Sequence, residues 1–298
     1  MIPIKGFATF HPLKHCIVGT AHDPSDVEEP LKKIMEETSE DLDNLENALT
    51  GFGVNCYRPT IEKKDSRPPV SPRDYFVAIG ENLFVGKVIS GYKDILKQID
   101  REKIKWYLGD DISSANMIRC GNHVHWDISS DVRANTENAI KDWLSEKGYQ
   151  ISVTRHGWHM DGIYSILKPG VIVASHDLPE LEQIYQGWDI CYLEPTQNKI
   201  PFKHQWGGNH NESNYDLNIL SVDEKTCITT SLNKVLFDFL KKHGIAPVLC
   251  PLRHQTFWDN GINCMTQALC GFYPSPRSMH SLFVALGCPI YVYLRCFL

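Results

Sequence analysis

The sequence has no cluster of basic residues and no uninterrupted apolar run of membrane-spanning length. Its 30 Lys and Arg residues are outnumbered by 36 Asp and Glu residues, which gives a formal net charge of -6. Binding to a nucleic acid backbone requires concentrated positive charge, so nucleic acid is not an expected partner. The N-terminal residues MIPIKGFATFHPLK lack the continuous apolar segment of a signal peptide. We therefore expect a cytoplasmic protein.

The apolar C-terminal stretch and the cysteines do not change this expectation. Residues 282–298 are apolar but are interrupted by Gly287, Pro289 and Arg295, whereas a membrane helix needs about 20 apolar residues. The chain has ten cysteines, scattered through apolar segments where a thiol behaves as a small hydrophobic group. Examples are Cys16, Cys56, Cys191, Cys227 and Cys250. In a reducing cytoplasm we expect them to remain thiols.

Glycines end the helical segments in a repeated pattern. Amphipathic helices are predicted within residues 28–54, 136–149, 178–189 and 232–245, and each runs into glycine. The glycines are Gly51 and Gly53, Gly148, Gly187, and Gly244. Glycine just past a helix adopts the left-handed C-cap conformation at little steric cost. A short β-type run follows each glycine, and a fifth helix is predicted over 92–108 without a glycine stop.

Four β-hairpins are predicted between these helices. They span residues 74–86, 116–129, 162–175 and 217–231, each with a turn signal at its centre. A fifth hairpin is predicted between residues 14–21 and 264–271, near the two ends of the chain. Five units of two strands, a helix and another strand predict a closed ring of ββαβ modules without an open edge. We expect one domain over residues 1–271, followed by a tail, 272–298, to which the pattern assigns no role.

Polar residues stand at the heads of these hairpins, where a ring would bring them together. Cys264 follows the turn DNGIN and begins the last β-type run, so a ring would present its thiol to a central cavity. In HMDG, residues 159–162, His159 and Asp161 share one face of an extended chain. Asp74 and Asn116 are the first residues of the first and second hairpins. Taken singly, a buried structural cysteine and a hydrogen-bonded core histidine are the commoner roles for such residues.

Together these motifs resemble the amidinotransferase branch of the guanidino-group-modifying enzymes, typified by glycine amidinotransferase. The matching segments are residues 11–21, 72–86, 113–122, 159–175, 217–225 and 260–269, so the resemblance covers most of residues 11–271. The resemblance implies an α/β fold, the five-bladed α/β-propeller or pentein fold, with pseudo-fivefold ββαβ modules around a central active-site channel. It implies small-molecule substrates and neither a cofactor nor a metal.

The resemblance also implies roles for the matching residues. Cys264 corresponds to the nucleophile and His159 to the general acid and base. Asp74 and Asp161 correspond to the carboxylates that hold the substrate guanidinium, a planar cation that pairs bidentately with carboxylates. The implied reaction moves an amidino group from a donor, L-arginine, through a covalent amidino-cysteine to an acceptor amine.

Three positions depart from the family pattern. Asn116 stands where the family has an Asp that completes a catalytic triad, and an amide fixes an imidazole tautomer without stabilising its charge. Leu178 stands where the family has an Arg that binds an amino-acid carboxylate, and Asp216 stands in place of a Ser with the same task. An apolar side chain and an anion at these positions favour a cationic amine acceptor over glycine.

Three other interpretations remain open at this stage. The first is a hydrolase of the same fold, in which water replaces the acceptor amine. The second is a catalytically silent binder of guanidino or amine ligands, as Asn116 and Leu178 suggest. The third is a zinc protein built on Cys120, His123 and His125, although their spacing matches no common zinc motif and the two histidines are expected to face the surface. The oligomeric state is open, with a homodimer as one possibility.

Overall fold

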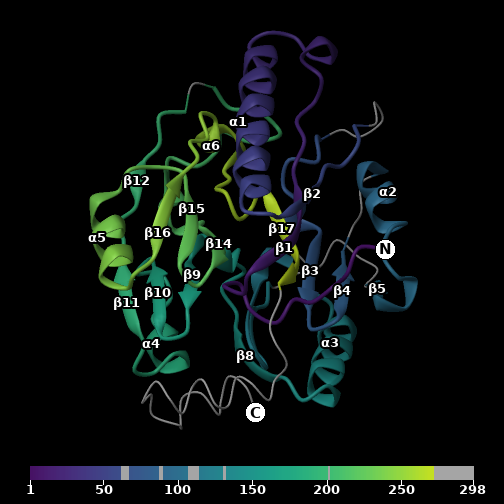
Figure 1. Cartoon of the computed structure of the whole chain (residues 1–298), viewed down its shortest axis with the longest axis vertical. Helices are drawn as coiled ribbons and strands as arrows, with labels where there is room; N and C mark the ends of the chain where they lie inside the picture. The colour runs from purple at the N-terminus through teal and green to yellow at the C-terminus, as the bar shows by residue number, and fades with distance from the viewer. Residues whose placement is uncertain (62–66, 87–89, 107–113, 130–131, 201, 272–298) are drawn as a thin grey trace.

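The fold is described here from a computed structural model of the whole chain (Figure 1). The structure describes residues 1–271 except 62–66, 87–89, 107–113, 130–131 and 201. The predicted tail, 272–298, therefore lies outside the described residues. Among the helices within these limits, none combines the length and the apolar character that a membrane span needs.

The strands form five three-stranded sheets with one shared topology. The first sheet contains β1 (Leu13–Val18), β2 (Asn55–Tyr57) and β17 (Thr266–Gly271) in the order β17-β1-β2. The other sheets, each given along the chain, are β3 (Phe76–Ile79), β4 (Asn82–Val85) and β5 (Ile104–Trp106); β6 (Met117–Cys120), β7 (His123–Asp127) and β8 (Gln150–Thr154); β9 (Tyr164–Lys168), β10 (Val171–Ala174) and β11 (Asp189–Tyr192); and β14 (Leu220–Asp223), β15 (Thr226–Thr229) and β16 (Ala246–Leu249). In every sheet the middle strand pairs antiparallel with one neighbour and parallel with the other.

These pairings confirm all five predicted hairpins. Four are local hairpins, whereas β1 and β17 come from opposite ends of the described chain and pair from Val18↔Thr266 to Leu13↔Gly271. The third strand of each sheet runs parallel to the middle strand, which requires a long crossover connection. A sixth, two-stranded sheet joins β12 (Thr196–Gln197) to β13 (Glu212–Ser213) outside this pattern.

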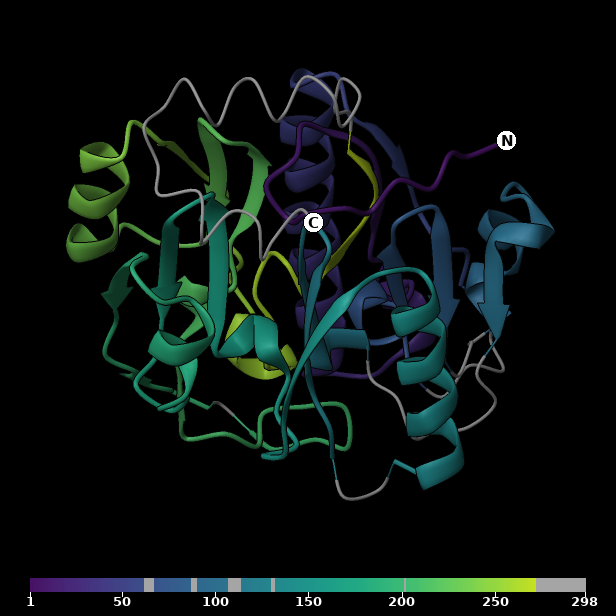
Figure 2. The same ribbon diagram turned by 90° about the horizontal axis from the view of Figure 1, so that it is seen from below.

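A helix lies in each crossover. The helices are α1 (Leu31–Gly51), α2 (Lys93–Leu96), α3 (Ala134–Glu146), α4 (Leu181–Ile184) and α5 (Lys234–Lys242), and α6 (Gln255–Trp258) precedes β17. Figure 2 shows α3 and α5 on opposite sides of the molecule with sheets between them. The glycines that follow α1, α3, α4 and α5 all have positive φ, between 67° and 81°, as the predicted C-caps require.

The long fifth helix predicted over 92–108 is wrong. Helix α2 ends at Leu96, and Asp100 then caps a short 3-10 turn by accepting the backbone N–H of Glu102 at 3.0 Å. Residues Ile104–Trp106 become β5, which pairs parallel with β4. A third strand is needed to complete this sheet as in the other four, so tertiary pairing overrides the local helical pattern.

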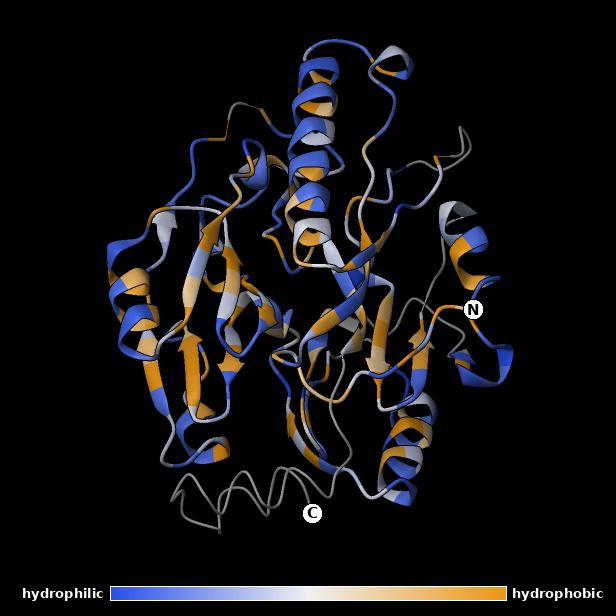
Figure 3. Ribbon diagram, in the orientation of Figure 1, coloured by the Kyte–Doolittle hydropathy of each residue, from blue (hydrophilic) through white to orange (hydrophobic). Residues whose placement is uncertain are grey.

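The core lies between the sheets and the helices that cover them. Strands β3, β6 and β10 are buried at every position, as expected for strands packed on both faces. Helix α1 buries Leu42, Leu45 and Leu49 completely. Figure 3 shows hydrophobic residues concentrated along many of the strands. On the helices, hydrophobic and hydrophilic residues alternate around the helix axis.

A short 3-10 turn precedes the first strand of each local hairpin, and these turns lie next to one another. They are η2 (Pro72–Asp74), η5 (Ser114–Asn116), η6 (Met160–Gly162) and η7 (Tyr215–Leu217). Contacts join η2 to η5, η5 to η6 and η6 to η7, and β17 contacts η2. The four turns that carry the polar hairpin heads therefore lie next to one another, as a common site requires.

Candidate active site

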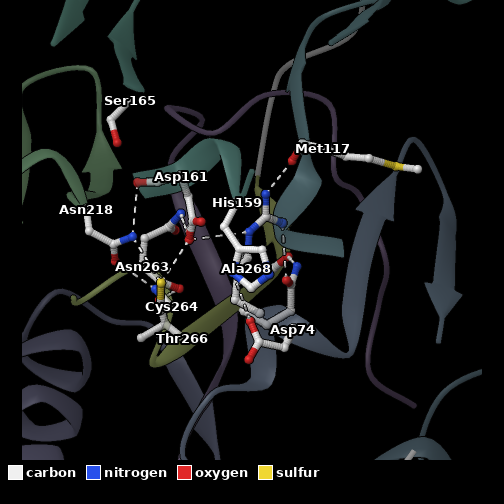
Figure 4. A network of polar contacts seen from close by, with 12 residues as sticks. Asp74, Met117, His159, Asp161, Ser165, Asn218, Asn263, Cys264, Thr266 and Ala268 are labelled. Atoms are coloured by element: carbon white, nitrogen blue, oxygen red, sulfur yellow. Dashed lines mark hydrogen bonds and ion pairs between the residues drawn. The ribbon is translucent and has the colours of Figure 1, made fainter. Parts of the chain in front are cut away.

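Cys264 lies two residues before β17 and is 6% exposed. Its thiol donates to Asp161 Oδ2 at 3.2 Å, and the side-chain amide of Asn218 donates to Sγ at 3.0 Å. The backbone N–H of Cys264 in turn donates to Asn218 Oδ1 at 2.8 Å. Figure 4 shows these three side chains pointing toward one another. The thiol is thus fixed between a carboxylate and an amide.

Asp161 is the buried anion of this network, with 1% of the residue exposed. Its Oδ2 also accepts the Asn263 amide at 3.3 Å and lies 4.0 Å from Nε of the buried Arg73. Its other carboxylate oxygen, Oδ1, is buried and has no hydrogen-bond partner among the described residues. A buried acceptor of this kind costs free energy unless a ligand satisfies it.

Asp74 and His159 form the other side of the site. His159 Nδ1 lies 3.7 Å from Asp74 Oδ1, and 49% of the His159 side chain is exposed. Asp74 Oδ1 is buried and accepts no hydrogen bond from the described residues. The structure therefore brings four predicted residues, Asp74, His159, Asp161 and Cys264, into one cluster (Figure 4).

Burial and like charges keep the thiol protonated in the ligand-free site. Burial raises the pKa of Cys264 well above its usual value, and the charges of Asp161 and Asp74 raise it further. Burial also raises the pKa of Asp74, with His159 acting in the opposite direction. Burial lowers the pKa of the Arg73 guanidinium, while Asp161 opposes that shift. A cationic ligand between the two carboxylates would favour the thiolate.

The remaining predicted site residues have other contacts. Asn116 is buried, and its side-chain amide donates to the main-chain oxygen of Asp127 at 3.0 Å. Leu178 is buried in a hydrophobic cluster that includes Met160. Asp216 accepts the Ser231 hydroxyl at 2.5 Å and the Asn233 amide at 2.8 Å, which links η7 to the N-cap of α5. Leu178 and Asp216 thus make contacts outside the Cys264 network.

The expectation that His123 and His125 face the surface is wrong. Both are buried, because β7 is covered on both faces. His125 contacts the hydroxyls of Tyr164 and Thr154 at 2.8 and 3.0 Å. Burial lowers the pKa of each of the two histidines to about 4, which leaves both neutral at pH 7. Within the described residues, no group of His, Cys, Asp or Glu is arranged to hold a metal.

Three residues of this network were missed from the sequence, which are Arg73, Asn218 and Asn263. Arg73 directly precedes Asp74, and its guanidinium lies beside Asp161. Asn218 follows η7 and holds both the backbone and the thiol of Cys264. The available signal was the rule that each hairpin head is polar. At the head of the fourth hairpin, both Asp216 and Asn218 are polar, so the rule does not choose between them. The structure shows that Asn218 contacts Cys264.

Comparisons with known proteins agree with the resemblance. No protein-family model matches the chain. An L-arginine:L-lysine amidinotransferase of Pseudomonas savastanoi pv. phaseolicola is 20% identical over 242 residues. This match covers 65% of the present chain and 65% of the relative, so the chain spans just under two thirds of the curated protein that it matches.

Similar solved structures have the same fold. SxtG, an amidinotransferase of the saxitoxin biosynthetic pathway of Microseira wollei, superposes with a TM-score of 0.74 at 18% identity, covering 92% of this chain and 98% of that one. Inosamine-phosphate amidinotransferase StrB1 of Streptomyces griseus superposes with a TM-score of 0.71 at 19% identity, covering 91% and 97%. A DDAH of Pseudomonas aeruginosa gives a TM-score of 0.64 at 14% identity, covering 86% and 98%. The chain therefore has the α/β fold of these enzymes, and it resembles amidinotransferases in sequence as well as in structure.

Proposed function

We propose that the protein is an amidinotransferase that moves an amidino group from a guanidino donor, L-arginine, to an acceptor amine through Cys264. The observation that carries this proposal is a thiol 3.2 Å from the buried Asp161 carboxylate, in a site shared with the partly exposed Asp74 carboxylate. Each carboxylate has one buried oxygen that lacks a hydrogen-bond partner among the described residues. A guanidinium offers N–H donors in one plane and a permanent positive charge, which suit these two acceptors.

The chemistry follows from this arrangement. With the donor bound, Cys264 gives its proton to His159, and the thiolate attacks the guanidino carbon, so that a C–S bond forms as the C–N bond to the donor amine breaks. Protonated His159 gives a proton to the leaving amine, which departs as ornithine. The acceptor amine then attacks the amidino-cysteine, a new C–N bond forms, the C–S bond breaks, and His159 takes the proton. Asp74 and Asp161 stabilise the positive charge throughout.

The architecture that we propose for this site is a closed propeller of five ββαβ blades forming one catalytic domain over residues 1–271. Support comes from the shared topology of the five sheets, the contacts between consecutive turns, and the hydrogen bonds between Asn218 and Cys264. We also propose a cytoplasmic location. The eight cysteines within the described residues are thiols rather than disulfides, which suits a reducing compartment.

A hydrolase of the same fold is the second candidate. DDAH and an agmatine deiminase are among the proteins with similar structures, and in such a reaction water would replace the acceptor amine. Incubation with arginine and a panel of amines separates the candidates. Ornithine formation that depends on the amine supports transfer, whereas citrulline or amine-independent turnover supports hydrolysis. Failure of arginine to react under all conditions favours a silent binder.

The pH dependence of thiol reactivity provides a first prediction. The thiolate is the reactive form of cysteine, and the pKa of Cys264 lies well above its usual value. We therefore expect iodoacetamide to modify Cys264 slowly at neutral pH and faster as the pH rises. The variant Asp161→Asn removes one charge that raises this pKa, so the onset of alkylation should move to lower pH.

Peptide mass spectrometry across about pH 6 to pH 10 would measure this profile. Cys56 is an internal control, because burial raises its pKa to about 11 through contacts away from Asp161. Its profile should not change in Asp161→Asn. An unchanged Cys264 profile in the variant would show that the Asp161 charge does not control the thiol.

The second prediction concerns the acceptor. We propose a cationic amine without a nearby carboxylate, because Leu178 and Asp216 replace the side chains that would hold a carboxylate. Loss of one charge-assisted hydrogen bond, worth about 1.5–3 kcal/mol, reduces the use of glycine about tenfold or more. Competition between glycine and a diamine, with both amidino products quantified, measures the preference. Preference for glycine over every diamine would contradict the acceptor assignment.

A further inference from the structure

Asp127, the last residue of β7, has a buried carboxylate that accepts three hydrogen bonds. It is 0% exposed. Its Oδ1 accepts the Thr154 hydroxyl at 2.6 Å and the His156 N–H at 3.0 Å, and its Oδ2 accepts the Trp158 N–H at 2.6 Å. Burial acts to raise the pKa of Asp127, but these hydrogen bonds outweigh it and lower the pKa overall. The group therefore remains an ionised acceptor.

The residues that Asp127 holds lead directly to His159. Strand β8 ends at Thr154, and residues 155–158 connect it to His159 without forming a helix or strand. Gly157 has a φ of 79°, a conformation that suits glycine, and it lies between the two backbone N–H groups that Asp127 binds. One buried carboxylate thus binds the backbone on both sides of Gly157, in the segment that leads to His159.

A second contact connects Asp127 to η5, the turn next to η6. Its main-chain oxygen accepts the side-chain amide of Asn116, the last residue of η5. Turns η5 and η6 are in contact, and His159 is the N-cap residue of η6. Asp127 therefore fixes two of the turns that form the site, although no described contact joins it to Cys264 or to the carboxylates that face the ligand.

We propose that Asp127 is a positioning residue for His159: it holds residues 156–158 so that the imidazole delivers its proton to the leaving amine. This inference rests on the proposed amidino transfer. A displacement of about 1 Å in such a group can cost about a hundredfold in rate. The expected effect is therefore on the proton-transfer step and not on donor binding, which depends on Asp74 and Asp161.

The variant Asp127→Asn tests the proposal because it keeps the shape of the side chain. One of its two terminal atoms becomes an NH2 donor facing backbone N–H groups, so at least one hydrogen bond to residues 156–158 is lost. Two donors should then be compared in single-turnover measurements of the first half-reaction. L-Arginine releases an alkylamine that must be protonated, whereas S-methylisothiourea releases methanethiolate without a proton and leaves the same amidino-Cys264.

We expect the arginine rate to fall about a hundredfold and the S-methylisothiourea rate to fall no more than about threefold, with unchanged arginine affinity. Asp41→Asn is the matched control. Asp41 is also buried, and its carboxylate also accepts a backbone N–H, that of Arg253. The variant Asp41→Asn should lower the stability of the fold without changing the ratio of the two rates. This is the behaviour expected of a residue with a purely structural role.

Equal losses with both donors, or an unchanged arginine rate, would overturn the assignment to Asp127. If Asp127→Asn does not fold, Gly157→Ala strains the backbone of the same exposed segment, because alanine disfavours positive φ. An unchanged rate ratio in that variant would also overturn the assignment. If the wild-type protein accepts an amidino group from neither donor, the proposed function itself fails. That result differs from a failure of the Asp127 assignment, in which the wild-type protein reacts and only the variants behave unexpectedly.

Discussion

Cys264→Ala is expected to lose amidino transfer by a factor of about 10⁴ or more, because the proposed two-step pathway needs the Cys264 thiol as its covalent nucleophile. Arginine binding should persist, since Asp74 and Asp161 and their unpaired oxygens are unchanged. Ornithine release measures the first effect, and calorimetric titration with arginine measures the second. The fold should survive, because alanine only shortens a side chain at the edge of a ligand site.

The matched control for this experiment is Cys227→Ala. Cys227 is a fully buried thiol in β15, within the hydrophobic cluster that contains Leu236 and Leu240. This variant should lose some stability through the cavity that it creates but should retain turnover. Wild-type turnover in Cys264→Ala, or an amidino adduct on Cys227, would remove Cys264 from the mechanism.

His159→Asn is expected to lower turnover by about a hundredfold or more, since in the proposed reaction His159 transfers a proton in both half-reactions. Donor affinity should change little, because the two carboxylates remain. About half of the His159 side chain is exposed, so the substitution opens no cavity in the core. Steady-state turnover, arginine binding and thermal unfolding measured on the same sample separate these effects.

His176→Asn is a suitable control for a solvent-exposed imidazole beside a carboxylate, since His176 lies 3.5 Å from Glu194. It should leave turnover unchanged. Loss of both binding and folding in His159→Asn would show that His159 is a structural residue, in which case another group must supply the proton.

The hairpins and the helix ends could be predicted from the sequence because their signals are local. Turn residues mark the hairpin centres, and a glycine at positive φ follows each of four helices. The pairing of β1 with β17 could be predicted because four complete units left two unpaired segments. The fifth helix could not be predicted correctly, because the pairing of Ile104–Trp106 with β4 is a tertiary effect.

The site could be predicted in part for a similar reason. Asp74, His159, Asp161 and Cys264 belong to motifs at hairpin heads, and the structure brings them together. Asn218 lies two residues from Asp216, and only the path of the chain after η7 decides which side chain faces the thiol. The burial of His123 and His125 was missed because, as a rule, polar residues at alternate positions of a strand mark a solvated face. That rule holds only for a sheet with one face in solvent, and β7 is covered on both faces.

The contacts of Asp127 could not be predicted from the sequence either. An aspartate at the end of a β-strand suggests a turn or a solvated edge, and nothing in the sequence around it indicates a ligand for backbone N–H groups. Its role depends on residues 27 to 31 positions away, as the separations to Thr154, His156 and Trp158 show. Such a contact is set by the packing of β7 against β8.

Whether Cys264 carries the amidino group is measured most directly by the mass of the Cys264 peptide after mixing with arginine labelled at the guanidino carbon. We expect one labelled amidino group on Cys264, release of one ornithine, and transfer of the label to an amine added afterwards. A label on a different cysteine, or a labelled enzyme that yields citrulline and never passes the label to an amine, would contradict this expectation.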